Sequence, residues 1–167
     1  MKDYRVLDNK IKERIKRSSK VLVLLGARQV GKTTLLKRIF PEGVYVNLEK
    51  SDYIEVFNRS GVDEIEAVLK KEGKGNLLIL DEAQRLDNPG LVAKLIYDEL
   101  SADVRLVISG SSSLEIANKA AETLAGRKET FTLYPLTVEE RLVQKGISLD
   151  NINQEDLKME ILDGMRY

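Results

Sequence analysis

One eight-residue segment constrains the fold of this 167-residue chain more than any other: it reads GARQVGKT and runs from Gly26 to Thr33. It matches the pattern G-x-x-x-x-G-K-[ST]. The apolar residues 21–25 before it are typical of a strand buried in a parallel sheet, and residues 34–39 after it have helical spacing. The glycines permit a tight loop with inward N–H groups, and the helix N-terminus adds partial positive charge. The segment therefore predicts a phosphate-binding loop.

This loop assigns particular chemistry to its last two residues. Lys32 is expected to reach the β- and γ-phosphate oxygens of a nucleotide and to assist catalysis there, and Thr33 is expected to supply a hydroxyl group to Mg²⁺. The residues predicted to bind the nucleotide are Gly26, Ala27, Arg28, Gln29, Val30, Gly31, Lys32, Thr33 and Thr34.

A second signal is the apolar run 77–80, which ends in Asp81 and Glu82. An acid at the carboxyl end of a buried parallel strand lies at the sheet edge where such folds bind ligands, so Asp81 is the predicted second contributor to the Mg²⁺ site. Glu82 then faces the γ-phosphate, where a carboxylate can orient and deprotonate a water molecule. The alternative for an isolated pair is a strand end that simply reaches solvent.

Strand-like and helix-like segments alternate along the chain. This alternation predicts an α/β fold, a three-layer sandwich with a mostly parallel five-stranded sheet covered on both faces. Because one strand and helix region separates Lys32 from the strand that ends in Asp81, an extra strand is expected between the two, which gives the order 5-1-4-3-2. The strands expected after the first are 44–48, 76–80, 104–109 and 129–134, and the helices between them are 33–40, 62–72, 90–101 and 113–121.

The predicted strand order places residues 104–109 between the phosphate loop and the acidic pair. The serine-rich segment 109–113 therefore emerges where a polar side chain can touch the γ-phosphate or the attacking water, with Ser111 as the first candidate and Ser109 as the second. An alternative of equal weight is that these serines only form the turn and cap the next helix.

Composition removes several classes of chemistry. The chain has no His and no Cys, which excludes a His-based triad, a thiol nucleophile, disulfides and the usual zinc sites, and leaves Mg²⁺ on oxygen ligands as the expected metal. Lys plus Arg and Asp plus Glu number 27 each, so global charge does not support nucleic-acid binding. No apolar run is long enough for a membrane span or a signal peptide, which predicts a cytoplasmic protein without a membrane partner.

The two ends of the chain differ from its middle. Residues 1–20 are basic, and the four-residue spacing of Leu7, Ile11 and Ile15 favours an amphipathic helix docked on the domain over a nucleic-acid-binding arm. Thr137 and Glu140 form the pattern of a helix-starting capping box. We expect one domain over residues 1–145, followed by an acidic tail, or the start of a truncated C-terminal region, over 146–167.

The motifs together resemble the AAA-type branch of the P-loop ATPases. More narrowly, they resemble a prokaryotic family of AAA-domain ATPases whose full-length members carry a C-terminal domain of unknown function, and the resemblance covers roughly residues 1–145. The segments that carry it are GARQVGKTTLL at 26–36, LDEAQ at 80–84, SGSS at 109–112, LAGR at 124–127 and LYPLT at 133–137.

The resemblance implies an ATP-binding module that hydrolyses ATP with Mg²⁺ and forms the N-terminal part of a longer protein. It also implies that Arg127 senses or stabilises the γ-phosphate, within one chain or across a subunit interface. Self-association or a protein partner is left open. The adenine base is expected near the N-terminal segment, against Tyr4 and Arg5.

The residues bear on three alternatives to an ATPase. A GTPase is disfavoured because the Asn-Lys-x-Asp signature is absent: Asn118-Lys119 is followed by two alanines. A small-molecule kinase is less favoured because a glutamate beside the metal-binding aspartate suits the activation of water. A nucleotide-dependent interaction switch with very slow hydrolysis is the alternative from another class.

Overall fold

The five predicted strands form a single parallel sheet in the computed structural model, which describes residues 5–59, 61–72, 76–111, 123–147 and 153–164. The order across the sheet is β2-β3-β4-β1-β5, which confirms the predicted order 5-1-4-3-2 read from the other edge. The strands are β1 Val21–Gly26, β2 Val44–Asn47, β3 Leu77–Asp81, β4 Arg105–Gly110 and β5 Lys128–Leu133.

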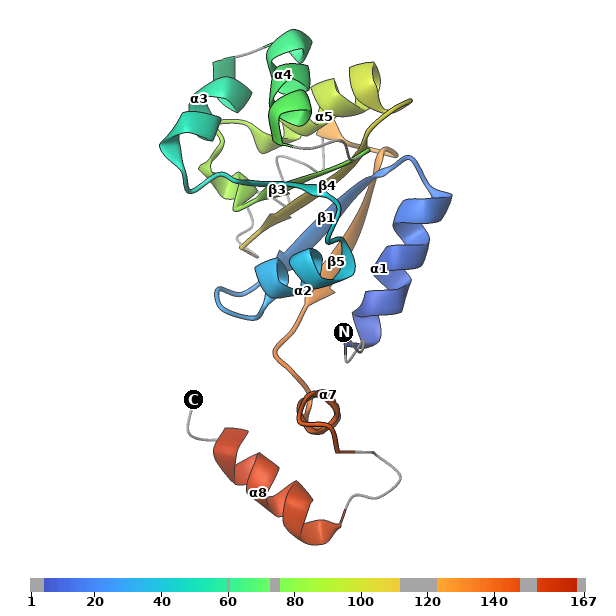
Figure 1. The fold of residues 1–167 in the computed structure, drawn as a ribbon, viewed down its shortest axis with the longest axis vertical. Coiled ribbons are helices and arrows are strands. Elements are labelled where there is room, and N and C mark those ends of the chain that lie inside the picture. Colours follow the sequence, from blue (N-terminus) through green and yellow to red (C-terminus); the bar gives the residue numbers. More distant parts are fainter. Residues whose placement is uncertain (1–4, 60, 73–75, 112–122, 148–152, 165–167) are drawn as a thin grey trace.

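Helices cover both faces of the sheet, as expected for a three-layer α/β sandwich (Figure 1). One layer consists of α1 and α2, and the other of α3, α4 and α5. The helices are α1 Val6–Arg17, α2 Lys32–Ile39, α3 Ser51–Arg59, α4 Val62–Glu72, the short 3₁₀ helix η1 Ala83–Arg85, α5 Pro89–Leu100, α7 Val138–Gln144 and α8 Gln154–Gly164.

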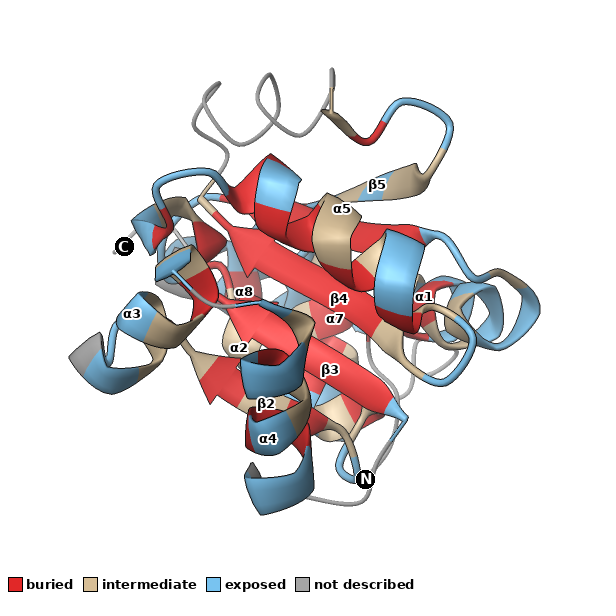
Figure 2. Ribbon diagram, turned by 90° about the horizontal axis from the view of Figure 1, so that it is seen from above, coloured by how far each residue is buried: buried red, intermediate tan, exposed pale blue. Residues whose placement is uncertain are grey.

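Alternate residues of the strands pack against opposite helix layers. In β1, Val21 and Val23 face the core under α3 to α5, whereas Leu22 and Leu24 face the core under α1 and α2. Figure 2 shows β3 buried throughout, β4 buried after its first residue, and the edge strand β5 only partly buried. A strand covered on both faces needs apolar side chains at every position, which explains the uninterrupted apolar runs of the sequence.

The N-terminal segment forms the expected amphipathic helix. In α1, Ile11 is fully buried and Leu7 and Ile15 pack against the same core from its margin. The Thr137 capping box is also present, because Thr137 Oγ1 accepts the Glu140 N–H and the Glu140 side chain accepts the Thr137 N–H. No helix in the described parts of the chain has both the length and the apolar character needed to cross a bilayer.

The sequence does not predict α3, η1 or α8, and one predicted helix lies outside the described residues. Helix α3 occupies a segment in which the sequence predicts no element, and α8 occupies the weakly periodic tail. The predicted helix 113–121 falls within the segment that the structure does not describe.

The topology brings three strand ends together at one edge of the sheet. Strand β4 lies between β1 and β3, and all three run parallel, so their carboxyl ends meet. The register pairs Leu24 with Ser109 on one side of β4 and Leu80 with Ile108 on the other. The phosphate loop, Asp81 and Ser109 therefore lie close together although 83 positions separate Gly26 from Ser109 in the sequence.

Candidate functional site

The backbone of the phosphate loop adopts the left-handed conformation at two positions. Gln29 has φ of 63° and Gly31, which precedes α2, has φ of 95°. Glycine accepts this region without steric cost, whereas glutamine is strained there. Gly26 is needed for a different reason: a Cβ on it would lie 2.6 Å from the backbone oxygen of Leu133. The glycines thus allow the turn and its close approach to β5.

Lys32 lies inside the loop that precedes it. Its side chain is buried, and Nζ donates to the carbonyl oxygens of Gly26 at 3.0 Å and Ala27 at 2.9 Å. An ammonium group has three N–H donors, so by count one of them is left for a ligand oxygen. A buried cation on these two carbonyls supplies the positive charge that a phosphate needs at this position.

The Asp81 carboxylate, 1% exposed, receives hydrogen bonds from four donors on different parts of the fold. Thr33 Oγ1 donates to Oδ2 at 2.6 Å, and the Tyr45 hydroxyl donates to the same oxygen. The Ser109 hydroxyl and the Glu82 N–H donate to Oδ1, the latter at 3.1 Å. These bonds fix the orientation of the carboxylate.

The chemistry of this donor set fits Mg²⁺. Thr33 and Asp81 present a hydroxyl and a carboxylate, the hard oxygen donors that Mg²⁺ prefers, 2.6 Å apart at the end of the loop. Among the described residues no cluster of three or more His, Cys, Asp or Glu side chains is placed to hold a metal ion. Such a pair suits a metal that is shared with phosphate oxygens rather than one enclosed by protein ligands alone.

Glu82 follows Asp81 in a strained backbone conformation, with φ of 59°. Its side chain accepts a hydrogen bond from Gln84 Nε2, and Gln84 Oε1 in turn accepts the Ser111 N–H at 3.3 Å. A non-glycine residue in the left-handed region costs energy, and such residues cluster at functional sites. The end of β3 and the segment after β4 are therefore joined through Gln84.

The structure gathers most of the residues expected at the site, but their individual roles remain predictions. The loop, Lys32, Thr33, Asp81 and Glu82 lie at one edge of the sheet. Ser109 hydrogen-bonds to Asp81, and Ser111 contacts Gln84 through its backbone N–H.

Sequence reasoning missed the contacts made by Tyr45 and Gln84. Gln84 was visible only as part of the LDEAQ segment. Nothing in the sequence singled out Tyr45, because its contact with Asp81 depends on the pairing of β2 with β3.

Arg127 is not brought to this site. Its backbone oxygen accepts the N–H of Val21, the first residue of β1, so it lies at the opposite edge of the sheet from the loop that follows β1. The six residues of β1 span roughly 17 Å at about 3.3 Å per residue. The half-exposed Arg127 side chain pairs instead with Asp98, at 3.2 Å. Arg127 therefore lies away from the phosphate loop of its own chain, and its action on a γ-phosphate stays a prediction.

The N-terminal residues expected near the adenine base are only partly described. Tyr4 lies outside the described residues. Arg5 is buried and donates through Nη2 to the carbonyl oxygen of Val30, at 2.8 Å. Arg5 is thus placed against the outside of the phosphate loop, and its contact with a base remains a prediction.

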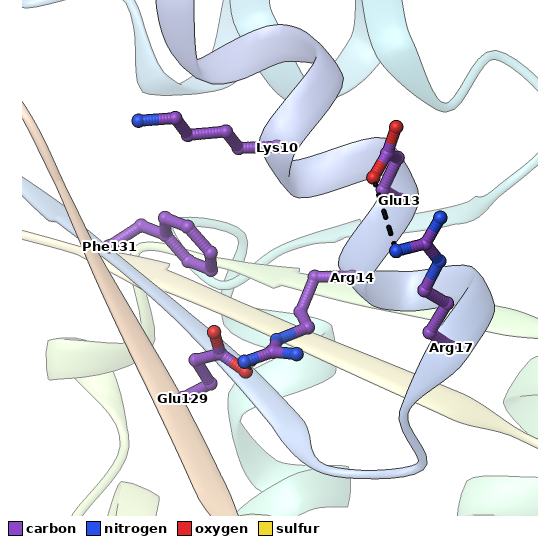
Figure 3. Close-up of a pocket in the computed structure, with 6 residues that line it drawn as sticks. All are labelled: Lys10, Glu13, Arg14, Arg17, Glu129 and Phe131. Atoms are coloured by element: carbon purple, nitrogen blue, oxygen red, sulfur yellow. Dashed lines mark hydrogen bonds and ion pairs between the residues drawn. The ribbon is translucent and has the colours of Figure 1, made fainter.

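Two surface hollows lie away from the phosphate loop. One, of about 250 Å³, opens between α1 and β5 (Figure 3) and contains the Arg17–Glu13 and Arg14–Glu129 ion pairs. The other, of about 530 Å³, includes Lys16 and Arg105 near the amino-terminal ends of β3 and β4. Neither is lined by a loop residue or by the acidic pair. We therefore assign neither to the nucleotide.

Comparison with known proteins agrees with this arrangement. A family model described as an AAA domain matches residues 18–142. An uncharacterized protein of Methanocaldococcus jannaschii is 30% identical over 178 residues, which cover 98% of this chain and 37% of the relative. An uncharacterized protein of Mycobacterium tuberculosis is 30% identical over 120 residues, which cover 72% of this chain and 26% of the relative. The chain thus spans well under half the length of these relatives.

Solved structures share the fold. A signal transduction ATPase with numerous domains (STAND) from Pyrococcus horikoshii, which carries a tetratricopeptide repeat sensor, superposes with a TM-score of 0.53 at 15% identity, over 90% of this chain and 26% of that one. The family match includes the phosphate loop, the acidic pair and the strands that bring them together. On this evidence the chain belongs to the AAA domain family of P-loop NTPases.

Proposed function

We propose that this chain binds ATP at the phosphate loop and hydrolyses it with Mg²⁺. The observation that carries the proposal is the hydrogen bond of 2.6 Å between Thr33 and Asp81. It joins the end of the phosphate loop to the end of β3, so the expected phosphate-binding and metal-binding groups form one site. ATP is favoured over GTP because the guanine signature is absent from the sequence.

The loop and Lys32 bind and orient the phosphates in this proposal. Backbone N–H groups of the loop and the N-terminus of α2 attract the anion, and Lys32 contributes a buried positive charge. Thr33 and Asp81 would hold Mg²⁺, which when bound neutralises charge on the phosphate oxygens. Because this site is built before the nucleotide arrives, little reorganisation is needed during the reaction.

Glu82 is the proposed general base. It lies next to the metal-binding aspartate, and a carboxylate there can accept a proton from the attacking water and orient it. Gln84 holds the Glu82 side chain through Oε2, which leaves the other carboxylate oxygen, by count, for the water. Ser111 is retained as a candidate contact for the γ-phosphate because Gln84 links its backbone to Glu82.

The hydrogen bond from Gln84 to Glu82 supports a second candidate function. If Gln84 keeps the Glu82 carboxylate engaged after nucleotide binds, water activation is impaired and the chain acts as a nucleotide-dependent switch with very slow hydrolysis. The two functions share the binding site and differ in turnover, so one assay separates them.

Phosphate release from ATP and Mg²⁺, measured beside nucleotide affinity, tests the proposal. Glu82→Gln should leave ATP affinity near that of the wild type and lower turnover by about 10², because the amide keeps the shape but cannot accept a proton. Asp81→Ala should weaken Mg²⁺-dependent binding as well as turnover, because it removes a proposed metal-binding group. Glu42→Gln, on the exposed surface after α2, is the matched control.

Three results decide between the alternatives. Wild-type turnover that falls with Glu82→Gln supports the ATPase. Tight ATP binding with negligible wild-type turnover supports the switch. Turnover that neither substitution changes would mean that the acidic pair is structural, and the catalytic assignment would be wrong.

Self-association is part of the proposal only through Arg127. Because Arg127 lies at the far edge of the sheet in its own chain, it could reach a γ-phosphate only in another copy. Turnover per chain that rises with protein concentration, and is lost in Arg127→Ala, is the expected result for this arrangement. A monomer with full activity would contradict it.

A further inference from the structure

Four charged side chains form a buried cluster beside the phosphate loop, outside the residues assigned to the reaction. They are Arg5, Asp8, Arg38 and Glu140, whose side chains are between 0% and 10% exposed. Removing charges from water is costly, so such groups persist only when they are paired and hydrogen-bonded. This group, the Arg5 cluster, joins α1, α2 and α7 to the loop.

Arg5 holds three separate segments with one planar guanidinium group. Nη2 donates to the carbonyl oxygen of Val30 in the phosphate loop, at 2.8 Å. Nη1 donates to the carbonyl oxygen of Tyr134, after β5, at 2.8 Å and to Glu140 Oε2 in α7 at 3.3 Å. The rigid fork of an arginine keeps these contacts at fixed relative positions, which a flexible lysine would not do.

The contact with Val30 acts directly on the conformation of the phosphate loop. A trans peptide is planar, so its C=O and the following N–H point in opposite directions. When Arg5 holds the Val30 carbonyl, it also sets the direction of the Gly31 N–H on the other side of the same peptide plane. Gly31 precedes α2, where the loop N–H groups are expected to face phosphate.

Asp8 and Glu140 bond the segment around Arg5 to α2 and α7. Asp8 accepts the Arg5 N–H at 3.1 Å and binds the Arg38 guanidinium of α2 through both oxygens, at 2.6 and 2.7 Å. Glu140 accepts the Val6 N–H at 3.0 Å and the Thr137 N–H at 3.1 Å. The first turn of α7 is therefore bonded to the same segment that holds the phosphate loop.

We propose that Arg5 is a positioning residue that couples nucleotide occupancy of the phosphate loop to the position of helix α7. The inference rests on the proposed nucleotide binding and assigns a regulatory output to that site. Phosphate bound to the Gly31 N–H fixes the orientation of the peptide between Val30 and Gly31. Arg5 connects this peptide to α7, because it donates both to the Val30 carbonyl oxygen and to Glu140. Coupling of this kind is reciprocal, so a change at Glu140 that alters the position of α7 also alters the affinity for nucleotide.

Hydrogen–deuterium exchange of the whole chain, with and without Mg²⁺ and a non-hydrolysable imido analogue of ATP, tests the coupling. In the wild type, saturating analogue should slow exchange both in the loop, residues 26–34, and in α7. In Arg5→Gln the analogue should still protect the loop at saturation, but the protection of α7 should be lost. Arg17→Gln, at an exposed position of α1, is the control and should behave as the wild type.

Two further variants guard against a general loss of folding. Arg5→Lys keeps the positive charge but not the fork, so it should fold and show partial loss of the α7 response. Glu140→Gln keeps a residue able to complete the capping box, so α7 should form. Because it removes the charge facing Arg5, it should weaken binding of the analogue about fivefold, near the lower end of typical coupling between sites.

Each alternative result has a distinct meaning. If the wild-type loop is protected but α7 is unaffected, or if Arg5→Gln and Arg5→Lys retain the full α7 response, the coupling is wrong and the proposed nucleotide binding stands. If the analogue protects no loop residue of the wild type, the proposed function is wrong and the inference falls with it.

Discussion

Asp81 illustrates how one residue depends on several elements at once. Its donors come from the start of α2, from β2 and from β4, so the carboxylate connects three neighbouring parts of the fold. A buried carboxylate is stable in the interior only while it is hydrogen-bonded. The stability of the nucleotide-free chain and the geometry of the proposed metal site therefore rely on the same bonds.

Removal of the Tyr45 hydroxyl tests this dependence. Tyr45→Phe keeps the ring, over which the Lys37 ammonium lies at 4.5 Å, and removes only the donor to Asp81. We expect the free energy of unfolding, measured by urea denaturation, to fall by about 1.5–3 kcal/mol, the range for hydrogen bonds to charged groups. In an Asp81→Asn background the same change should cost clearly less. An equal loss in both backgrounds would show that the bond to Asp81 is not the cause.

The sequence predicted those site contacts that a local motif specifies. The loop pattern and the acid at the end of an apolar run indicated that Thr33 and Asp81 would meet, and the structure places them in contact. The contact of Tyr45 could not be predicted, because a tyrosine in a short strand carries no signal until the register pairs Asn47 with Asp81. Contacts between distant elements depend on packing that a local pattern does not encode.

At the scale of elements, α8 differs from the other helices in the way it packs. Among its described side chains Glu160 is the buried one, and it pairs with Arg141 of α7 and with Lys145 directly after α7. The apolar residues Leu157 and Ile161 are about two-fifths exposed. Because a charged side chain forms its docking face, the apolar periodicity of the tail is weak.

Glu160 predicts a pH dependence for this packing. The hydrogen bond from Lys145, aided by the charges of Arg141 and Lys145, lowers the pKa of the Glu160 carboxyl group against the opposing effect of desolvation. A lowered folded-state pKa gives stability that is complete above about pH 5 and is lost as pH falls through that pKa. Glu160→Gln should therefore be less stable than the wild type at pH 7, with a difference that disappears in acid.

Urea denaturation of both proteins between pH 7 and pH 3 measures this difference. The substituted glutamine mimics a protonated glutamate, so the two curves should converge at the acidic end. Glu155→Gln, at an exposed position of the same helix, controls for the loss of a charge. A difference that is independent of pH would contradict the assignment to the Glu160 ion pairs.

At the scale of the whole molecule, the sheet order determines which residues can act together. With β4 between β1 and β3, the carboxyl ends of all three strands form one edge, and the loop and the acidic pair lie there. The sequence predicts this order because one strand and helix region separates Lys32 from the strand that ends in Asp81, which places an extra strand between the two. The same topology separates Arg127 from the loop, since residues at the amino-terminal end of β5 lie at the other edge.

The extent of the chain also matters at this scale. The match with the Methanocaldococcus jannaschii relative covers 98% of this chain but only 37% of the relative, so the relative contains a large further region. In this chain the proposed coupling from the nucleotide site ends at α7, which Glu140 bonds to Arg5.

Isothermal titration of ATP and Mg²⁺ into the wild type and Lys32→Ala is the most direct test of the central claim, that the phosphate loop binds nucleotide. The wild type should bind one ATP per chain, and loss of a charge-assisted hydrogen bond should weaken binding about tenfold to a hundredfold in the variant. Lys10→Ala, on the exposed surface of α1, should bind as the wild type does, and melting curves should show that both variants fold. Failure of the wild type to bind ATP, or equal affinity in folded Lys32→Ala, would contradict the account.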